Sequence, residues 1–138
     1  MSELEDFLRT VVPAQETADN ALINGDPEPR TRLWSHHDPV TLFGAERSAT
    51  GWAEVSAVFR WLSTHLSQGE LRLEVLAADV RGDLAYTVAC EHTTASFDGG
   101  PRRSVRLRVT HLYRREDGAW KIAHRHGDGL PPDPGAPG

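Results

Sequence analysis

The segment 104–128, SVRLRVTHLYRREDGAWKIAHRHGD, constrains the fold more than any other part of the sequence. Apolar and polar residues alternate on both sides of the turn signal Glu116-Asp117-Gly118. Alternation with a period of two predicts two antiparallel β-strands joined by that turn. Which side chains share a face depends on the loop, because a shift of one residue in the pairing moves every side chain of a strand to the opposite face.

Two loops fit this segment. A two-residue Asp117-Gly118 loop places His111 opposite His124. A three-residue 116–118 loop ends with Gly118 in a left-handed conformation, which glycine adopts without strain, and we prefer it for that reason. It groups an arginine, a threonine and two histidines beside a tryptophan on one face, a mixture unusual for a plain core: Arg108, Thr110, Leu112, Trp120, Ile122, His124 and His126.

Length and charge exclude several classes of protein. A chain of 138 residues predicts one domain that buries roughly two-thirds of its unfolded surface. The formal net charge is −5 and no run of five like charges occurs, so we expect neither nucleic acid nor membrane as a partner. An acidic, amphipathic N-terminus unlike a signal peptide indicates a cytoplasmic protein. The single Cys90 permits no disulfide within the chain, and we interpret it as a core residue.

The order of predicted elements gives the fold class. Helical spacing predicts helices over 2–13 and 14–24, separated at Pro13, and a third from Thr50 or Gly51 to Gly69. Residues 26–30 and 44–50 are predicted loops, 32–35 a short strand or the end of a helical turn, and 40–43, 71–80 and 84–97 strands. We therefore predict a single α+β domain over 1–128, with helices on one face of a curved antiparallel sheet, and a flexible tail over 129–138.

Three segments resemble the nuclear transport factor two-like superfamily, which includes ketosteroid isomerases and SnoaL-like polyketide cyclases. LWSHHDPVTLFG with GWAEVSAVFRWL is similar to the family's first strand and third helix, DLAYTVACEHT to its central strand, and RVTHLYRREDGAWKIAHRHGD to its closing hairpin. The match covers nearly all of residues 1–128. The resemblance implies a cone-shaped, cystatin-like roll in which the sheet and the three helices enclose a deep pocket.

The same resemblance leaves the function open, because this scaffold carries isomerases, cyclases, dehydratases and non-catalytic modules. It implies a domain that works without a cofactor, since the family is mostly metal-free. Ketosteroid isomerases carry a carboxylate base near the end of the first strand. The roughly matching position here is Leu42 or Phe43, so that mechanism cannot be transferred to this chain.

The segment 124–128, HRHGD, is the strongest candidate for chemistry. His124, His126 and Asp128 share one face of an extended strand, and Asp128 could fix the tautomer of His126. We predict His126 as a general base and Arg108 as the donor that stabilises an enolate oxygen, both lining one pocket. The alternative is a pair of histidines at the rim of the core.

Other residues are predicted to bind substrate. Glu91 shares a face with small residues that leave room for a ligand, although it could equally be a surface carboxylate. His37 and Asp38 could add an acid or base, but an Asp-Pro turn with solvated histidines is the preferred interpretation. The predicted substrate-binding set is Trp34, His37, Asp38, Trp52, Phe59, Glu91, Thr110 and Trp120.

A metal site is a competing idea that we do not adopt. The two histidines of HRHGD, with His36, His37 or His92, could supply three nitrogen ligands. The sequence contains neither HExxH nor CxxC, so we predict no metal and no cofactor.

Two classes of function remain. One is a cofactor-independent enzyme that transfers protons on a small apolar carbonyl or polycyclic substrate, as an isomerase, cyclase or dehydratase does. The other is a non-catalytic module that binds a small molecule or dimerises. A homodimer through the outer face of the sheet is expected in either case, because both faces of the hairpin carry apolar residues: Val105, Leu107, Val109 and Tyr113 oppose the Trp120 face.

Overall fold

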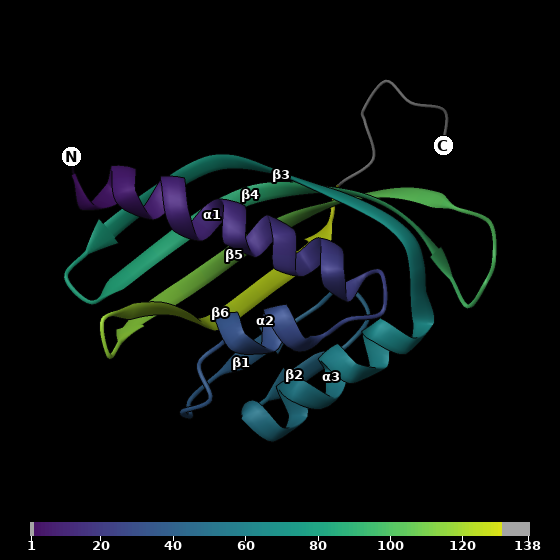
Figure 1. Ribbon diagram of the computed structural model, residues 1–138, viewed down its shortest axis with the longest axis horizontal. Coiled ribbons are helices and arrows are strands. Elements are labelled where there is room, and N and C mark those ends of the chain that lie inside the picture. The colour runs from purple at the N-terminus through teal and green to yellow at the C-terminus, as the bar shows by residue number, and fades with distance from the viewer. Residues whose placement is uncertain (1, 131–138) are drawn as a thin grey trace.

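The computed structural model describes residues 2–130, which form a curved six-stranded sheet with three helices against one of its faces (Figure 1). The α+β class predicted above is confirmed. Most of the predicted tail, residues 131–138, lies outside the described residues. The elements are α1 (Glu3–Leu22), α2 (Glu28–Leu33), β1 (Thr41–Phe43), β2 (Ser48–Thr50), α3 (Trp52–His65), β3 (Leu66–Arg81), β4 (Leu84–Phe97), β5 (Arg103–Glu116) and β6 (Ala119–Gly129).

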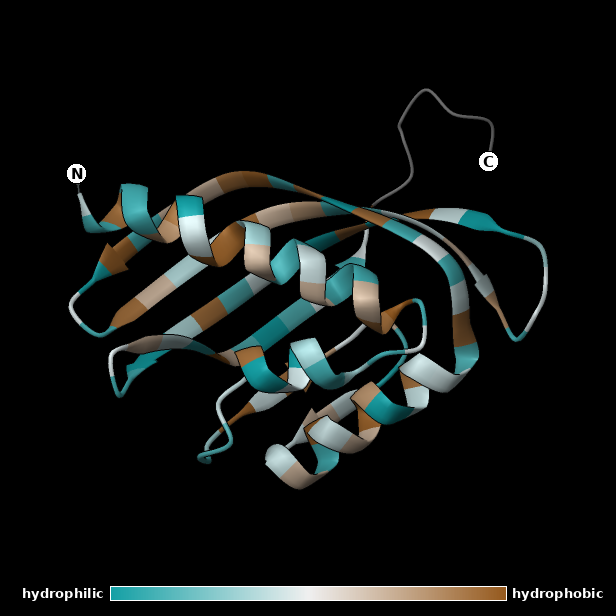
Figure 2. Cartoon of the chain, viewed as in Figure 1, coloured by the Kyte–Doolittle hydropathy of each residue, from teal (hydrophilic) through white to brown (hydrophobic). Residues whose placement is uncertain are grey.

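The sheet has the strand order β2-β1-β6-β5-β4-β3. Strands β3 to β6 form the predicted antiparallel meander, whereas β1 pairs with β6 in parallel. Hydrophobic and hydrophilic residues alternate along β5 (Figure 2), so one face of that strand turns to the helices and the other away from them. We call these the inner and the outer face of the sheet.

Helix α1 is one continuous helix, so the predicted break at Pro13 is wrong. Ser2 caps the helix by accepting a hydrogen bond from the Glu5 amide at 3.1 Å. Proline removes one helical hydrogen bond, but the buried stripe continues on both sides of it, with Phe7 before and Leu22 after. Packing of that stripe against the core outweighs the local preference for a break.

Side chains of α1 also bind the free edge of β3. Asn20 exchanges two hydrogen bonds of 2.8 Å with the backbone of Leu71, and Asn24 exchanges two of 2.9 Å with Gly69. Gly69 has no room for a side chain, because a Cβ there would lie 2.5 Å from Ile23. The end strand of the sheet is thus partly satisfied by a helix, which leaves less of it open to pairing with another chain.

Three other local predictions need correction. Helix α2 forms where a loop and an undecided segment were predicted, and β2 forms inside the predicted polar loop, where Ala49 is buried opposite Leu42. Helix α3 begins after Gly51 as predicted, but it ends at His65 and leads directly into β3. These short elements are held by the core, which is made of Phe7, Leu22, Trp34, Val40, Leu42, Ala49, Val55, Phe59, Ala85, Tyr113 and Ile122.

The hairpin of β5 and β6 combines features of both predicted loops. Glu116 pairs with Ala119, so the loop has two residues, and both Asp117 and Gly118 have positive φ, as a type I′ turn requires. A bulge then leaves Ala123 unpaired between the pairs Tyr113–Ile122 and Leu112–His124. The preferred three-residue loop is therefore wrong, but beyond the bulge His124 and His126 still share a face with Arg108, Thr110 and Leu112, as that loop would have placed them.

Candidate functional site

A cavity of about 730 Å³ lies between the inner face of the sheet, the end of α1, α2, α3 and the β1–β2 loop. Its walls are mainly apolar, and the charged side chains Arg30, Glu91 and Arg125 belong to its lining. Concave, mostly apolar cavities with a few polar groups are typical of small-molecule sites. The apolar lining includes Leu22, Ile23, Leu42, Val58, Trp61, Leu62, Leu66, Leu71, Phe97 and Leu107.

Arg30 is held in the wall by one of its nitrogens. Its Nε donates to Asp19 Oδ1 at 2.8 Å, and its guanidinium carbon lies 5.2 Å from the centre of the Phe59 ring. The side chain is only 7% exposed. Within residues 2–130 no acceptor lies in hydrogen-bond range of its two terminal NH2 groups, so they remain available to a ligand.

Arg125 and Glu91 form a two-pronged ion pair in the same wall. The two guanidinium NH2 groups donate to the two carboxylate oxygens at 2.6 and 2.9 Å. Both side chains are buried, which makes the pairing essential, since an isolated buried charge is very unfavourable. Glu91 is thus the one predicted site residue that the structure places in the cavity lining, and its partner is Arg125.

A buried polar network adjoins this pair. Gln15 from α1 donates to His111 Nδ1 at 3.1 Å and accepts a hydrogen bond from the Tyr113 hydroxyl group. His111 Nε2 lies 3.4 Å from Arg125 Nη1. The network helps to orient Arg125, because it packs His111 against the guanidinium group that binds Glu91.

Burial and the two arginines determine the protonation of this cluster. Burial favours a higher pKa for Glu91, but the charge and hydrogen bonds of Arg125, helped by His111 and Arg30, outweigh it and lower the pKa to about 2. Burial raises the pKa of Asp19, although the adjacent Arg30 opposes the shift. Burial and the charge of Arg125 lower the pKa of His111 well below 6.5, so its imidazole is neutral at pH 7.

Aromatic and cationic side chains also line the cavity where it approaches the β1–β2 loop. The Arg47 guanidinium carbon lies 3.7 Å from the centre of the Trp61 ring, within the range of a cation–π contact. Phe97 lies beside Trp61 with ring centres 5.9 Å apart. Arg103 from β5 also belongs to the lining. This part of the cavity therefore adds two more cations.

The predicted catalytic residues lie together, but on the outer face. Arg108 and Asp128 pair through two hydrogen bonds of 2.9 Å, and His126 is exposed beside them. None of Arg108, His124, His126 and Asp128 lines the cavity, so the prediction that they share a pocket is wrong. The physical reason is the bulge at Ala123: it keeps the four together while it turns Arg125 inward. Their participation in any reaction stays a prediction.

The remaining predicted substrate-binding residues serve other parts of the structure. Trp34 and Phe59 are core residues in an edge-to-face contact, and Trp120 packs on Phe7 away from the cavity. His37 and Asp38 are exposed, as the preferred interpretation of an Asp-Pro turn has them, and an Asp38 oxygen accepts a hydrogen bond from the Trp52 amide at 2.9 Å. Thr110 lies on the outer face opposite His126.

Neither of the two buried arginines of the cavity, Arg30 and Arg125, was predicted as a site residue. Arg125 lies between the two histidines of HRHGD, and its alternation with them was the available signal, but the loop register decided the face. Arg30 lies in a segment predicted as a loop, so nothing in its surroundings indicated burial. A pair of arginines becomes recognisable only when α2 and β6 are brought to the same cavity.

Comparisons with known proteins agree on the fold. The model of the SnoaL-like domain family matches residues 15–128. A structure from Streptomyces avermitilis, assigned provisionally as a dehydratase of the NTF2-like family, superposes with a TM-score of 0.75 at 19% identity, covering 93% of this chain and 99% of that chain. No curated protein matches the sequence.

Two other solved structures illustrate the functional range of the fold. A ketosteroid isomerase-like protein from Erwinia carotovora atroseptica has a TM-score of 0.75 at 17% identity, with 92% of this chain and 98% of that chain covered. A protein from Xanthomonas campestris, assigned provisionally as a calcium/calmodulin-dependent protein kinase II association domain, has a TM-score of 0.73 at 20% identity, with 89% and 87% covered. Identities this low establish a common fold alone.

Proposed function

The chain belongs to the SnoaL-like domain family, and we propose that its cavity binds a small, largely apolar molecule that carries one carboxylate. The observation that carries the proposal is Arg30, whose terminal NH2 groups have no acceptor within residues 2–130 although the side chain is almost fully buried. A guanidinium with two unpaired NH2 groups matches the two oxygens of a carboxylate.

The charge balance in the buried part of the site favours a single negative charge at that end of the ligand. Asp19 and Glu91 lie against Arg30 and Arg125 there, whereas the exposed cations Arg47 and Arg103 line the other part of the cavity together with Glu46. A monoanion adds one charge to a balanced cluster, whereas a phosphate dianion adds two in a poorly solvated space. We therefore favour a carboxylate over a phosphate ester.

The rest of the cavity determines the body of the ligand. Leucines, Val58 and the Trp61 ring face a space of about 730 Å³, which suits an aromatic or polycyclic skeleton. The segment around Arg30, DPEPRTRLW, contains no glycine-rich loop whose backbone amides could bind a phosphate. Side chains are therefore the donors to the anionic group of the ligand.

Proton transfer, the other function that the sequence suggested, has less support from this site. Two carboxylates, Glu46 and Glu91, belong to the lining: Glu46 is exposed at the β1–β2 loop, and Glu91, with a pKa of about 2, is a weak base at neutral pH. The neutral imidazole of His111 could accept a proton, but it is hydrogen-bonded to Gln15 and is not part of the lining. We therefore place binding before catalysis.

The test compares 2-naphthoate with its neutral amide, 2-naphthamide, by isothermal titration. We expect the acid to bind and the amide to bind at least about tenfold more weakly, since only the acid pairs with Arg30. Removing Arg30 alone would leave Asp19 buried and unpaired, so the variant is the double substitution Asp19→Leu with Arg30→Met. It should fold and lose at least about tenfold in affinity for the acid.

The matched control is Arg32→Met, which removes an exposed arginine from the same helix and should leave affinity unchanged. Equal binding of acid and amide would overturn the carboxylate assignment. Full affinity in the double variant, or no binding of either compound, would overturn the site itself.

We also propose that the outer face of the sheet binds a second copy of the chain. The apolar residues that support this differ from those predicted, because Val109 and Tyr113 are buried on the inner face. Four large apolar side chains are exposed on the outer face by 39 to 60%: Phe43, Leu84, Tyr86 and Leu112. The provisional assignment of structural neighbours as association domains agrees with such a role.

Light scattering at micromolar concentration tests this dimer. We expect a mass near twice the 15.2 kDa of the chain, and a shift to the monomer mass in the double variant Tyr86→Asp with Leu112→Asp. An exposed polar position on α1, Thr10→Asp, is the control and should remain dimeric. A monomer mass for the unmodified chain would exclude the dimer.

A further inference from the structure

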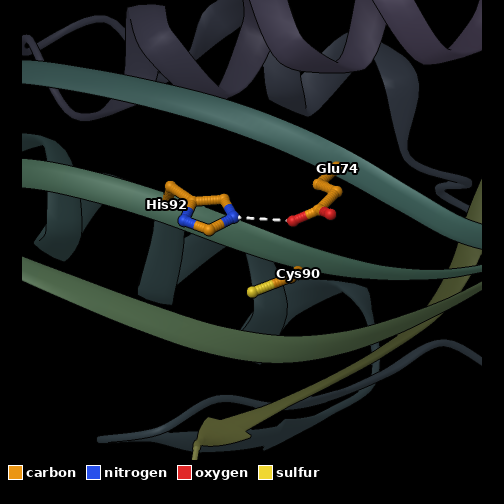
Figure 3. Close-up of side chains that lie close together, drawn as sticks. All are labelled: Glu74, Cys90 and His92. Carbon is orange, nitrogen blue, oxygen red and sulfur yellow. Dashed lines mark hydrogen bonds and ion pairs between the residues drawn. The ribbon is translucent and has the colours of Figure 1, made fainter.

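We propose that Glu74, Cys90 and His92 form a binding site for one zinc ion on the outer face of the sheet. Glu74 on β3 is the direct cross-strand partner of Cys90 on β4, and His92 follows Cys90 by two residues. Residues two apart on a strand point to the same face, so all three side chains converge there (Figure 3). Among residues 2–130 this is the one cluster of three metal-binding side chains.

The distances fit an ion with little movement. One ligand atom from each residue lies within 4.8 Å of the other two, so a point exists within about 2.8 Å of all three. Zinc bonds nitrogen, oxygen and sulfur at about 2.0 to 2.3 Å, so each side chain must approach the ion by about 0.5 to 0.8 Å. Rotations of the Glu74 and His92 side chains can supply that movement while the strands stay in place.

An existing hydrogen bond already orients two of the ligands. His92 Nε2 lies 2.9 Å from Glu74 Oε1, and Figure 3 shows the carboxylate directed at the ring edge. A metal ion replaces the shared proton when both groups coordinate it, and Cys90 releases its own proton to bind as a thiolate. The fourth position of a tetrahedral site is then open to water.

The choice of zinc follows from the donor atoms. A thiolate with an imidazole selects zinc or another borderline divalent ion over calcium and magnesium, which require oxygen ligands. The charge also balances, because thiolate and carboxylate together neutralise a divalent cation. Balance matters here since Arg72 and Arg106 flank His92 on the two neighbouring strands, while Arg108 is occupied by Asp128.

The experiment titrates the full chain, first treated with EDTA, with Co²⁺ as a visible probe for zinc. Cysteine-bound cobalt gives a strong near-ultraviolet charge-transfer band. We expect this band to saturate at one ion per chain and to be bleached when Zn²⁺ is added. Cys90→Ser should abolish the band, and His92→Gln and Glu74→Gln should each weaken the binding at least about tenfold.

The matched control is His126→Gln, which removes an exposed histidine from the same face and should leave the titration unchanged. The control also separates the proposed site from the neighbouring pair His124 and His126. Absence of the band, its persistence in Cys90→Ser, or its loss in His126→Gln would each overturn the proposal. The band is measured per chain, so its interpretation is the same for a monomer and a dimer.

Discussion

The two faces of β6 carry different kinds of polar residue. On the inner face Arg125 is 8% exposed and its guanidinium is paired to a buried carboxylate. On the outer face His126 is exposed, and neighbouring Asp128 pairs with an arginine that is half exposed. The segment 124–128, which we predicted to be one functional cluster, thus has two parts. Arg125 is buried and lines the cavity, whereas His126 and Asp128 are solvated and do not reach it.

Burial decides how much the loss of one partner of an ion pair destabilises the fold. The pairs Arg125–Glu91 and Arg108–Asp128 are both two-pronged with similar distances, although Arg125 donates through its two NH2 groups and Arg108 through Nε and one NH2 group. Water screens the outer pair, so its net contribution is small. Burial shields the inner pair from this screening, which makes each member dependent on the other.

The largest expected effect comes from breaking the inner pair. Arg125→Met leaves Glu91 buried and unpaired and should cost about 3 to 5 kcal/mol of unfolding free energy, measured by urea denaturation. Arg108→Met on the outer face should change the unfolding free energy far less, because water screens the pair that it breaks. The double variant Glu91→Leu with Arg125→Met should recover most of the loss, and equal losses for the two single variants would contradict the comparison.

Acidification should have the second-largest effect on the unfolding free energy, because it protonates Glu91 of the inner pair. The pKa of Glu91 is about 2 in the folded chain against 4.5 for the free side chain, so the unfolded chain binds that proton first as the pH falls. Its contribution of roughly 3 kcal/mol is complete above pH 4.5 and disappears as the pH falls towards 2. The lowered pKa of His111 acts in the same direction below pH 6.5, while the raised pKa of Asp19 opposes both.

Urea midpoints measured at pH 7, 5.5, 4 and 3 test this dependence. We expect the midpoint to fall with pH, most steeply below pH 4.5, and His111→Gln to reduce the fall between pH 7 and 5.5, because the variant lacks the imidazole that the unfolded chain protonates. A midpoint that stays constant down to pH 3 would contradict the lowered pKa of Glu91.

The smallest effect belongs to the outer histidine. His126→Ala should change the unfolding free energy by no more than about 0.5 kcal/mol and leave the affinity of the cavity for 2-naphthoate unchanged, because the side chain is solvated and lies outside the lining. Titration and urea denaturation of the same sample measure both. A tenfold loss of affinity would mean that the outer face communicates with the cavity.

Much of the fold could be predicted because it follows from local periodicity. The strands over 84–97 and 103–116, a turn ending at Gly118 and the start of α3 after Gly51 all have signals within a few residues, although the length of that turn was predicted wrongly. The errors occur where packing overrides a local signal. Pro13 lies inside a helix because Phe7 and Leu22 are buried on either side of it, and β2 forms because Ala49 pairs against the core.

The α+β class, the antiparallel meander and the polar cluster on β6 could all be predicted, since they depend on alternation between residues close together in the chain. Which face each polar residue occupies depends on tertiary contacts. One unpaired residue, Ala123, sets that choice, and no local signal distinguishes it from its neighbours. The cavity arginines required tertiary contacts for the same reason, because Arg30 and Arg125 are 95 positions apart and meet only when α2 packs over β6.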